Sequence, residues 1–146
     1  MAVDKKATLT YVQLMKEDLA VFRLVPEDGM IPDYETGQFI TLGMPIPSED
    51  NKIIRRAYSI ASHPENKRFI ELVIRWVRKP LPGRVTTALF NAGEGNEVSW
   101  LPPTGAALQI NEKLADGSKD QRRIVCVSGG TGIAPFMAFA RHLHAT

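Results

Sequence analysis

Hydrophobic and polar residues alternate in short segments through the N-terminal two thirds of the chain, and this pattern predicts strands. In the segment 69–77 an apolar side chain stands at every second position from Leu72 to Trp76, which is the period of a strand with two different faces. Turn-forming residues separate such segments, and this spacing favours a closed antiparallel barrel or a sandwich. The predicted strands are Thr8–Leu14, Leu19–Val25, Phe39–Gly43, Arg55–Ala61, Phe69–Val77 and Glu97–Trp100.

One helix interrupts the strand pattern. It is predicted over Val85–Asn91, after the turn-forming pair Pro82-Gly83. Gly93 follows the helix and is the residue type that most often ends one, because it adopts a left-handed backbone without strain.

The C-terminal part of the chain has a different pattern. The polar segment Asn111–Arg123 has the composition of a linker. An apolar strand at Ile124–Val127, a glycine-rich turn and a helix are predicted after it, and this order opens an α/β unit. We therefore assign residues 1–121 to a barrel domain with its linker and residues 122–146 to the start of an α/β domain.

Composition narrows the class of protein without naming a function. The chain has 44% hydrophobic and 23% charged residues, which is ordinary for a globular protein. A formal net charge of +2 gives no reason to expect nucleic-acid binding. No apolar segment is long enough for a membrane span and the N-terminus lacks a signal-peptide core. We expect a cytoplasmic protein that binds neither membrane nor nucleic acid.

The sequence gives little support for a metal site or a disulfide. The single cysteine, Cys126, excludes an intrachain disulfide and a four-cysteine metal site. Because it lies within the apolar segment Ile124–Val127, we expect a buried, unreactive thiol. His142 and His144 are two positions apart on a predicted helix and face different directions, so no metal site is expected there.

A cation, an aromatic ring and a hydroxyl follow one another at Arg56, Tyr58 and Ser59. Arg56 and Tyr58 project from one face of a strand, so a planar ring stacked on Tyr58 would place a phosphate near the Arg56 guanidinium. Ser59 points the other way unless the strand bends. On these residues alone, a surface strand with an exposed arginine and a half-buried tyrosine is the better interpretation.

Two helix starts suit phosphate groups. Free amides and the positive end of the helix dipole at Arg84, Val85 and Thr86 would hold a pyrophosphate, with the Thr86 hydroxyl either as a further donor or as a helix cap. The glycine-rich turn before Pro135 departs from the usual dinucleotide fingerprint because proline replaces the third glycine or alanine. Proline is well tolerated in a first helical turn, so a helix still begins there.

Several motifs in one order carry a family resemblance. The chain resembles the ferredoxin–NADP⁺ reductase family over nearly its whole length, and the ordered set is far more specific than any single motif. The matching segments are Thr36–Phe39, Arg56–Ser59, Leu72–Arg75, Gly83–Leu89, Pro103–Gly105 and Gly130–Pro135.

The resemblance implies a fold and a set of site residues. The expected fold is mainly β: a six-stranded antiparallel Greek-key flavin-binding barrel with one short helix, followed by the first βα unit of a Rossmann-like nucleotide domain. Tyr58, Ser59 and Thr131 are the expected catalytic residues: Tyr58 packs on the flavin, Ser59 hydrogen-bonds near its redox-active nitrogen, and Thr131 lies where nicotinamide stacks. The expected cofactor-binding residues are Arg56, Ala57, Tyr58, Ser59, Leu72, Val73, Ile74, Arg75, Arg84, Val85, Thr86 and Thr131.

The resemblance also implies an activity. It is electron transfer between NADPH and ferredoxin or flavodoxin through FAD, in a monomer, with FAD expected rather than FMN. Two alternatives stay open: a stand-alone flavin-binding electron-transfer subunit, and the reductase component of an oxygenase. The choice between NADP and NAD is also open. Family members continue for most of a further α/β domain, so we expect a partial chain that binds flavin and turns over NADPH poorly.

Overall fold

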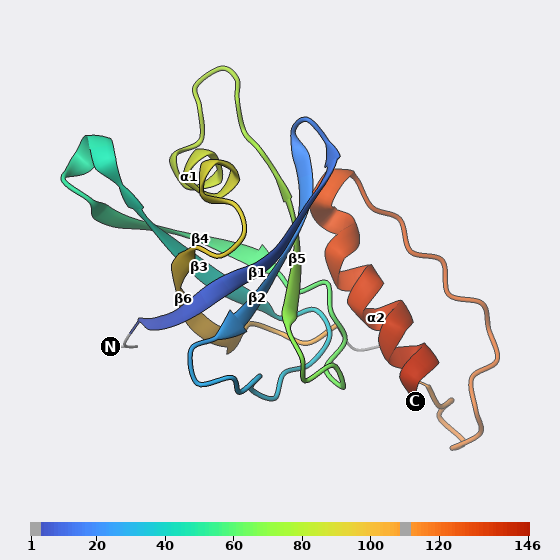
Figure 1. The fold of residues 1–146 in the computed structure, drawn as a ribbon. Helices are drawn as coiled ribbons and strands as arrows, with labels where there is room; N and C mark the ends of the chain where they lie inside the picture. The colour runs from blue at the N-terminus through green and yellow to red at the C-terminus, as the bar shows by residue number, and fades with distance from the viewer. Residues whose placement is uncertain (1–3, 109–111) are drawn as a thin grey trace.

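The barrel predicted from the sequence is present in the computed structural model, which describes residues 4–108 and 112–146 (Figure 1). All six predicted strands form. Three of them are three to five residues longer than expected, the strand expected at 55–61 is shifted toward the N-terminus, and the one expected at 69–77 is three residues shorter. The six strands are β1 (Lys5–Lys16), β2 (Leu19–Pro26), β3 (Phe39–Ile46), β4 (Lys52–Ser59), β5 (Ile70–Arg75) and β6 (Glu97–Thr104).

The strands form one antiparallel sheet in the order β4-β3-β6-β1-β2-β5. The two edges meet where the chain leaves β4: Ile60 pairs with Leu72 of β5, and the Ala61 amide donates to the Glu71 carbonyl at 2.8 Å. This seam closes the sheet into a barrel. Because β6 lies between β3 and β1, the connections are of the Greek-key kind.

The core fills the inside of the barrel with alternating residues from each strand. On β2, for example, Ala20, Phe22 and Leu24 are fully buried, while the residues between them face outward. Burying one large apolar side chain contributes about 1.5–3 kcal/mol, so this row is a major source of stability. The largest fully buried apolar side chains are Trp100, Phe22, Leu9, Leu24, Ile40, Leu42, Ile60, Ile70, Leu72, Ile74 and Leu89.

Helix α1 (Arg84–Ala92) covers one end of the barrel and confirms the helix predicted over 85–91. Val85 and Leu89 enter the core, and the Phe90 ring packs 5.3 Å from both Phe22 and Trp76. Gly93 ends the helix with φ of 71° and donates its amide to the Leu89 carbonyl, as its sequence position predicted. A short 3₁₀ helix, η1 (Pro47–Glu49), lies between β3 and β4.

In the C-terminal part, the predicted turn and helix are present and the predicted strand is not. The turn and helix form, as η2 (Gly130–Ile133) and α2 (Ala134–Ala145), and Pro135 lies in the first turn of α2. The predicted strand at 124–127 was wrong: residues 121–129 are unpaired, and Figure 1 draws them as an orange coil apart from the sheet. The predicted linker starts at Asn111, which lies outside the described residues.

Cys126 was also predicted wrongly. It is exposed, and its neighbours Val125 and Val127 are 82% and 85% exposed. A parallel-type strand is stable only when neighbouring strands take its amides and carbonyls and other elements cover both its faces. Within residues 4–108 and 112–146 no strand pairs with this segment, so its apolar side chains stay in solvent.

Among the described residues, no helix combines the length and the apolar character that crossing a bilayer requires.

Candidate flavin site

A hollow of about 440 Å³ opens where β4, β5, the start of α1 and η2 meet. It gathers segments from four parts of the chain, and all predicted site residues except Ser59 and Leu72 line it. Its lining consists of Arg56, Ala57, Tyr58, Val73, Ile74, Arg75, Val77, Gly83, Arg84, Val85, Thr86 and Thr131.

Strand β4 presents a cation and a phenol to the hollow. The Arg56 side chain makes no ion pair with any described residue; its Nη1 donates only to the Arg55 carbonyl, at 2.8 Å. The adjacent Arg55 is instead paired with Asp4 and lies outside the lining. Arg56 therefore brings an uncompensated positive charge to the hollow, which is the property that a phosphate ligand requires.

The Tyr58 hydroxyl is buried without a hydrogen-bond partner among the described residues. Burial raises the pKa of Tyr58 to about 12, despite the nearby positive charge of Arg56. Buried polar groups in folded proteins almost always have a partner, and leaving one unpaired costs about 1–3 kcal/mol. A ligand in the hollow that offers an acceptor to this hydroxyl would recover that free energy.

The start of α1 presents three unused amides. The first helical hydrogen bond is donated by Thr87 to the Gly83 carbonyl at 2.9 Å, and no described residue accepts from the amides of Arg84, Val85 or Thr86. Free amides at a helix start, together with the helix dipole, form an anion site. The Arg84 guanidinium is held by Glu49 at 2.6 Å, which ties α1 to η1.

The Thr86 hydroxyl is already engaged. It donates to the Gly83 carbonyl at 3.3 Å and accepts from the Val77 amide at 3.3 Å, so it fixes the loop that precedes α1. The helix cap itself is Gly83, with no side-chain cap. A Cβ at Gly83 would lie 2.6 Å from the Thr86 hydroxyl, so only glycine fits there without displacing that side chain.

Strand β5 contributes Val73, Ile74 and Arg75 to the hollow, and Ile74 is also part of the core. Val73 and Arg75 lie on the outer face, whereas Leu72 is fully buried and pairs through its backbone with Phe22 of β2. The Leu72 side chain therefore points away from the hollow. The resemblance had involved this strand through its backbone, which runs along the hollow.

Ser59 lies at the point where β4 ends. It pairs with Phe39 of β3, and the next residue, Ile60, already pairs with Leu72 of β5. The Ser59 side chain is not part of the lining, in line with its position opposite Tyr58 in an extended strand. The structure thus does not bring Ser59 into the hollow.

Thr131 reaches the hollow from the far end of the sequence. It lies in η2 and lines the hollow together with Val73 and Tyr58. Sequence reasoning placed Thr131 here by resemblance alone. The sequence did not lead us to Glu71 and Arg141, which join α2 to β5. A carboxylate inside an otherwise apolar strand was the one signal that pointed to Glu71.

The arrangement has the features of a site for a flavin nucleotide, and the comparison with known proteins agrees. Residues 6–108 match the sequence family described as the oxidoreductase FAD-binding domain. The chain belongs to this family. The residues of this FAD-binding domain also fit the cofactor on their own chemistry: an unpaired cation, three free amides and a partnerless phenol face one hollow.

Curated relatives of this FAD-binding domain are parts of larger redox systems. It is 26% identical over 125 residues to the electron transfer subunit of dihydroorotate dehydrogenase B (NAD(+)) from Streptococcus pneumoniae, covering 86% of this chain and 45% of the subunit. It is 28% identical over 145 residues to the reductase component of propane 2-monooxygenase from Mycolicibacterium goodii, covering 98% of this chain and 37% of that protein. The chain therefore spans less than half the length of either relative.

Solved structures share the fold. The flavohem-like FAD/NAD binding domain of nitric oxide dioxygenase from Vibrio cholerae superposes with a TM-score of 0.79 at 25% identity, over 97% of this chain and 56% of that one. A ferredoxin NADP⁺ reductase from Neisseria gonorrhoeae with bound FAD and NADP superposes with a TM-score of 0.69 at 20% identity, over 99% of this chain and 53% of that one. The six-stranded barrel is thus the FAD-binding fold of reductases of this type.

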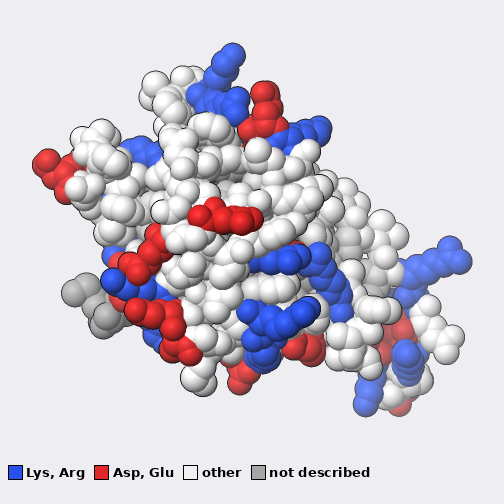
Figure 2. All heavy atoms as spheres, viewed as in Figure 1, with Lys and Arg blue, Asp and Glu red and all other residues white. Residues whose placement is uncertain are grey.

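The surface charge is mixed. Figure 2 shows acidic and basic side chains interspersed over one face of the molecule. Three exposed basic residues are paired with carboxylates: Arg55 with Asp4, Lys67 with Asp33 at 2.8 Å, and Arg78 with Glu17 at 3.8 Å. Exposed pairs of this kind contribute little to stability, and the face drawn in Figure 2 does not identify a redox partner.

Proposed function

We propose that this FAD-binding domain carries the flavin of an electron-transfer reductase, which takes electrons from a pyridine nucleotide and passes them to a separate redox protein. When bound, the flavin supplies the chemistry of accepting a hydride and releasing its electrons singly. The observation that carries the proposal is that Arg56, Tyr58, the free amides of α1 and Thr131 line one hollow.

The relatives favour two kinds of reductase over a ferredoxin–NADP⁺ reductase in the strict sense. The curated relatives described above are named as an electron transfer subunit and as a reductase component of a monooxygenase, and each name marks one part of a larger redox system. We therefore place this domain in an electron-transfer subunit or oxygenase reductase, with the final acceptor supplied by a partner protein.

The site residues bind different parts of the cofactor. The Arg56 guanidinium and the free amides at Arg84, Val85 and Thr86 bind the diphosphate, and the Tyr58 ring packs on the flavin with its hydroxyl donating to the ligand. Thr131 lies at the edge of the ring, beside the face on which nicotinamide stacks. Ser59 has no direct contact in this arrangement.

FAD is proposed rather than FMN because of a second groove. It lies between α1 and the β3–β4 connection, has a volume of about 570 Å³, and shares Gly83 and Arg84 with the hollow. Its lining is mostly apolar, with Met44, Ile46 and Pro82 among the residues. A ligand whose diphosphate lies at the start of α1 could thus extend an adenosine into this groove.

Loading the purified protein with flavin tests the proposal. FAD and FMN are titrated separately, and a bound flavin with shifted absorbance is expected, with FAD binding more tightly. Anaerobic mixing with NADH and with NADPH then measures whether either nucleotide bleaches the flavin, and slow bleaching is expected from a partial chain. A protein that retains neither flavin would overturn the assignment.

A further inference from the structure

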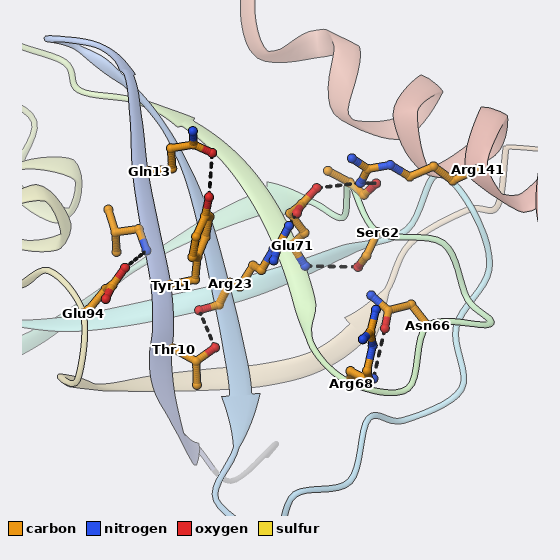
Figure 3. A network of polar contacts seen from close by, with 12 residues as sticks. Thr10, Tyr11, Gln13, Arg23, Ser62, Asn66, Arg68, Glu71, Glu94 and Arg141 are labelled. Atoms are coloured by element: carbon orange, nitrogen blue, oxygen red, sulfur yellow. Dashed lines mark hydrogen bonds and ion pairs between the residues drawn. The ribbon is translucent and has the colours of Figure 1, made fainter.

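Glu71 is a carboxylate buried in the wall of the barrel, with 2% of its surface exposed. Its two oxygens bind different cations: Oε2 accepts from Arg23 Nε at 2.8 Å, and Oε1 accepts from Arg141 Nη1 at 2.5 Å (Figure 3). A buried charge is tolerated only while its partners stay in place. The position of Glu71 is therefore tied to the positions of both arginines.

Glu71 lies on the same face of β5 as two residues that line the flavin hollow. Alternation along β5 places Glu71, Val73 and Arg75 on one face of the strand, and Val73 and Arg75 line the hollow. The Glu71 backbone is fixed at the barrel seam, where its amide donates to Ser62 Oγ at 3.0 Å and its carbonyl accepts from Ala61. The carboxylate thus stands on a rigid strand, next to the residues that line the hollow.

Arg141 belongs to α2, whose N-terminal end continues directly from the turn that holds Thr131. Ala134, Ala138 and Arg141 share one face of the helix by their spacing, and both alanines are buried. Their small side chains allow α2 to lie close to the barrel. Arg141 Nη1 donates both to Glu71 and to the Ala61 carbonyl at 3.2 Å, so it crosses the seam.

Arg23, on β2 of the barrel, is the second cation that binds the Glu71 carboxylate. Its guanidinium lies 4.2 Å from the Phe69 ring and 4.5 Å from the Tyr11 ring, and it occupies the Glu71 oxygen that Arg141 leaves free. Contacts of this kind hold a guanidinium in one orientation. The Glu71 carboxylate is consequently oriented by the barrel itself, with one oxygen presented to α2.

We propose that Glu71 is a positioning residue, which holds α2 against the barrel through Arg141 and thereby keeps Thr131 at the rim of the flavin hollow. The inference rests on the proposed function for its second half, the placement of Thr131 beside the flavin. Its first half, the docking of α2, concerns the protein chain alone. The competing role is purely structural: Glu71 would then join β5 to β2 through Arg23, and Arg141 would be dispensable.

Hydrogen exchange on the flavin-free protein tests the docking. In Arg141→Gln, the amides of α2 are expected to exchange about tenfold faster or more, while those of β2 and β5 keep their protection. The Arg141 side chain is 42% exposed, so the barrel should fold without it. Glu71→Gln is expected to loosen α2 in the same way. Lys67→Gln, which breaks the exposed pair with Asp33, is the matched control and should leave α2 unchanged.

The flavin-loaded protein tests the placement of Thr131. In Arg141→Gln, flavin affinity is expected to stay within about threefold of the wild type, while the visible circular dichroism of the bound flavin changes because Thr131 has moved. Unaltered protection of α2, or an unaltered dichroism spectrum, would overturn the proposal. If the wild type itself retains no flavin, the proposed function fails, and hydrogen exchange still decides whether Glu71 holds α2.

Discussion

Arg56 and Tyr58 stand two residues apart on β4 and both line the flavin hollow, whereas the neighbouring Arg55 is paired with Asp4 outside it. Only one of two adjacent arginines thus offers its charge to a ligand. The difference follows from the alternation of an extended strand, which turns successive side chains to opposite faces.

Replacing Arg56 by alanine tests the phosphate contact. Loss of a charge-assisted hydrogen bond of about 1.5–3 kcal/mol should weaken flavin binding by roughly one to two decades. Titration of the apoprotein, followed by flavin fluorescence, measures the change. Arg55→Ala is the control, and its flavin affinity should match the wild type. Equal losses in the two variants would show that general charge, not the Arg56 position, governs binding.

Tyr58→Phe should act with opposite signs on stability and on binding. Without flavin, removing a buried hydroxyl that has no partner among the described residues should raise the free energy of unfolding by about 1 kcal/mol. With flavin, losing the donor should weaken affinity about two- to tenfold. Urea unfolding and flavin titration of the same preparation measure both effects. A variant destabilised without flavin would mean that the hydroxyl has a partner in the apoprotein.

The groove beside α1 can be tested by filling it. Ala88 lines the groove and does not line the flavin hollow, so Ala88→Leu should weaken FAD binding by about tenfold and leave FMN within about threefold. The ratio of the two dissociation constants is the measurement. Ala115→Leu, at an exposed position, controls for added apolar surface. Parallel losses for FAD and FMN would argue against an adenosine in the groove.

The barrel was predictable because its signals are local. Period-two alternation identified the strands, and Gly93 marked the end of α1, since each depends on residues only a few positions apart. The Greek-key order came from the family resemblance and not from periodicity. The hollow followed from the same resemblance, because the ordered motifs bring Arg56, Tyr58 and Thr131 to one site although the last is more than 70 positions from the other two.

The parts that could not be predicted depend on distant partners. The segment 124–127 has the composition of a buried strand, but no described residue provides the neighbours that it needs, and Cys126 is exposed as a result. At Ser59 the chain changes from pairing with β3 to pairing with β5. The alternation of apolar and polar residues does not show where such a change occurs. Glu71 was visible as an odd carboxylate, but its partner Arg141 lies 70 positions away.

We expect Glu71 to make the stability of the protein sensitive to acid. Burial alone would raise the pKa of Glu71, but the hydrogen bonds and charges of Arg141 and Arg23 outweigh it and hold the pKa below its usual 4.5. A group whose pKa is lower in the folded state binds a proton more readily when unfolded. Its contribution to stability is therefore complete above pH 4.5 and is lost as the pH falls through the folded-state pKa.

Urea unfolding midpoints measured from pH 7 down to about pH 3 test this linkage. The wild type should lose stability below pH 4.5, and Glu71→Gln should show a flatter profile because it has no carboxylate to protonate. At pH 7 the variant should be less stable, since two guanidiniums lose their counter-charge. Lys67→Gln is again the comparison, because Asp33 is exposed and its pair contributes little. A Glu71→Gln profile as steep as that of the wild type would place the acid sensitivity in another carboxylate.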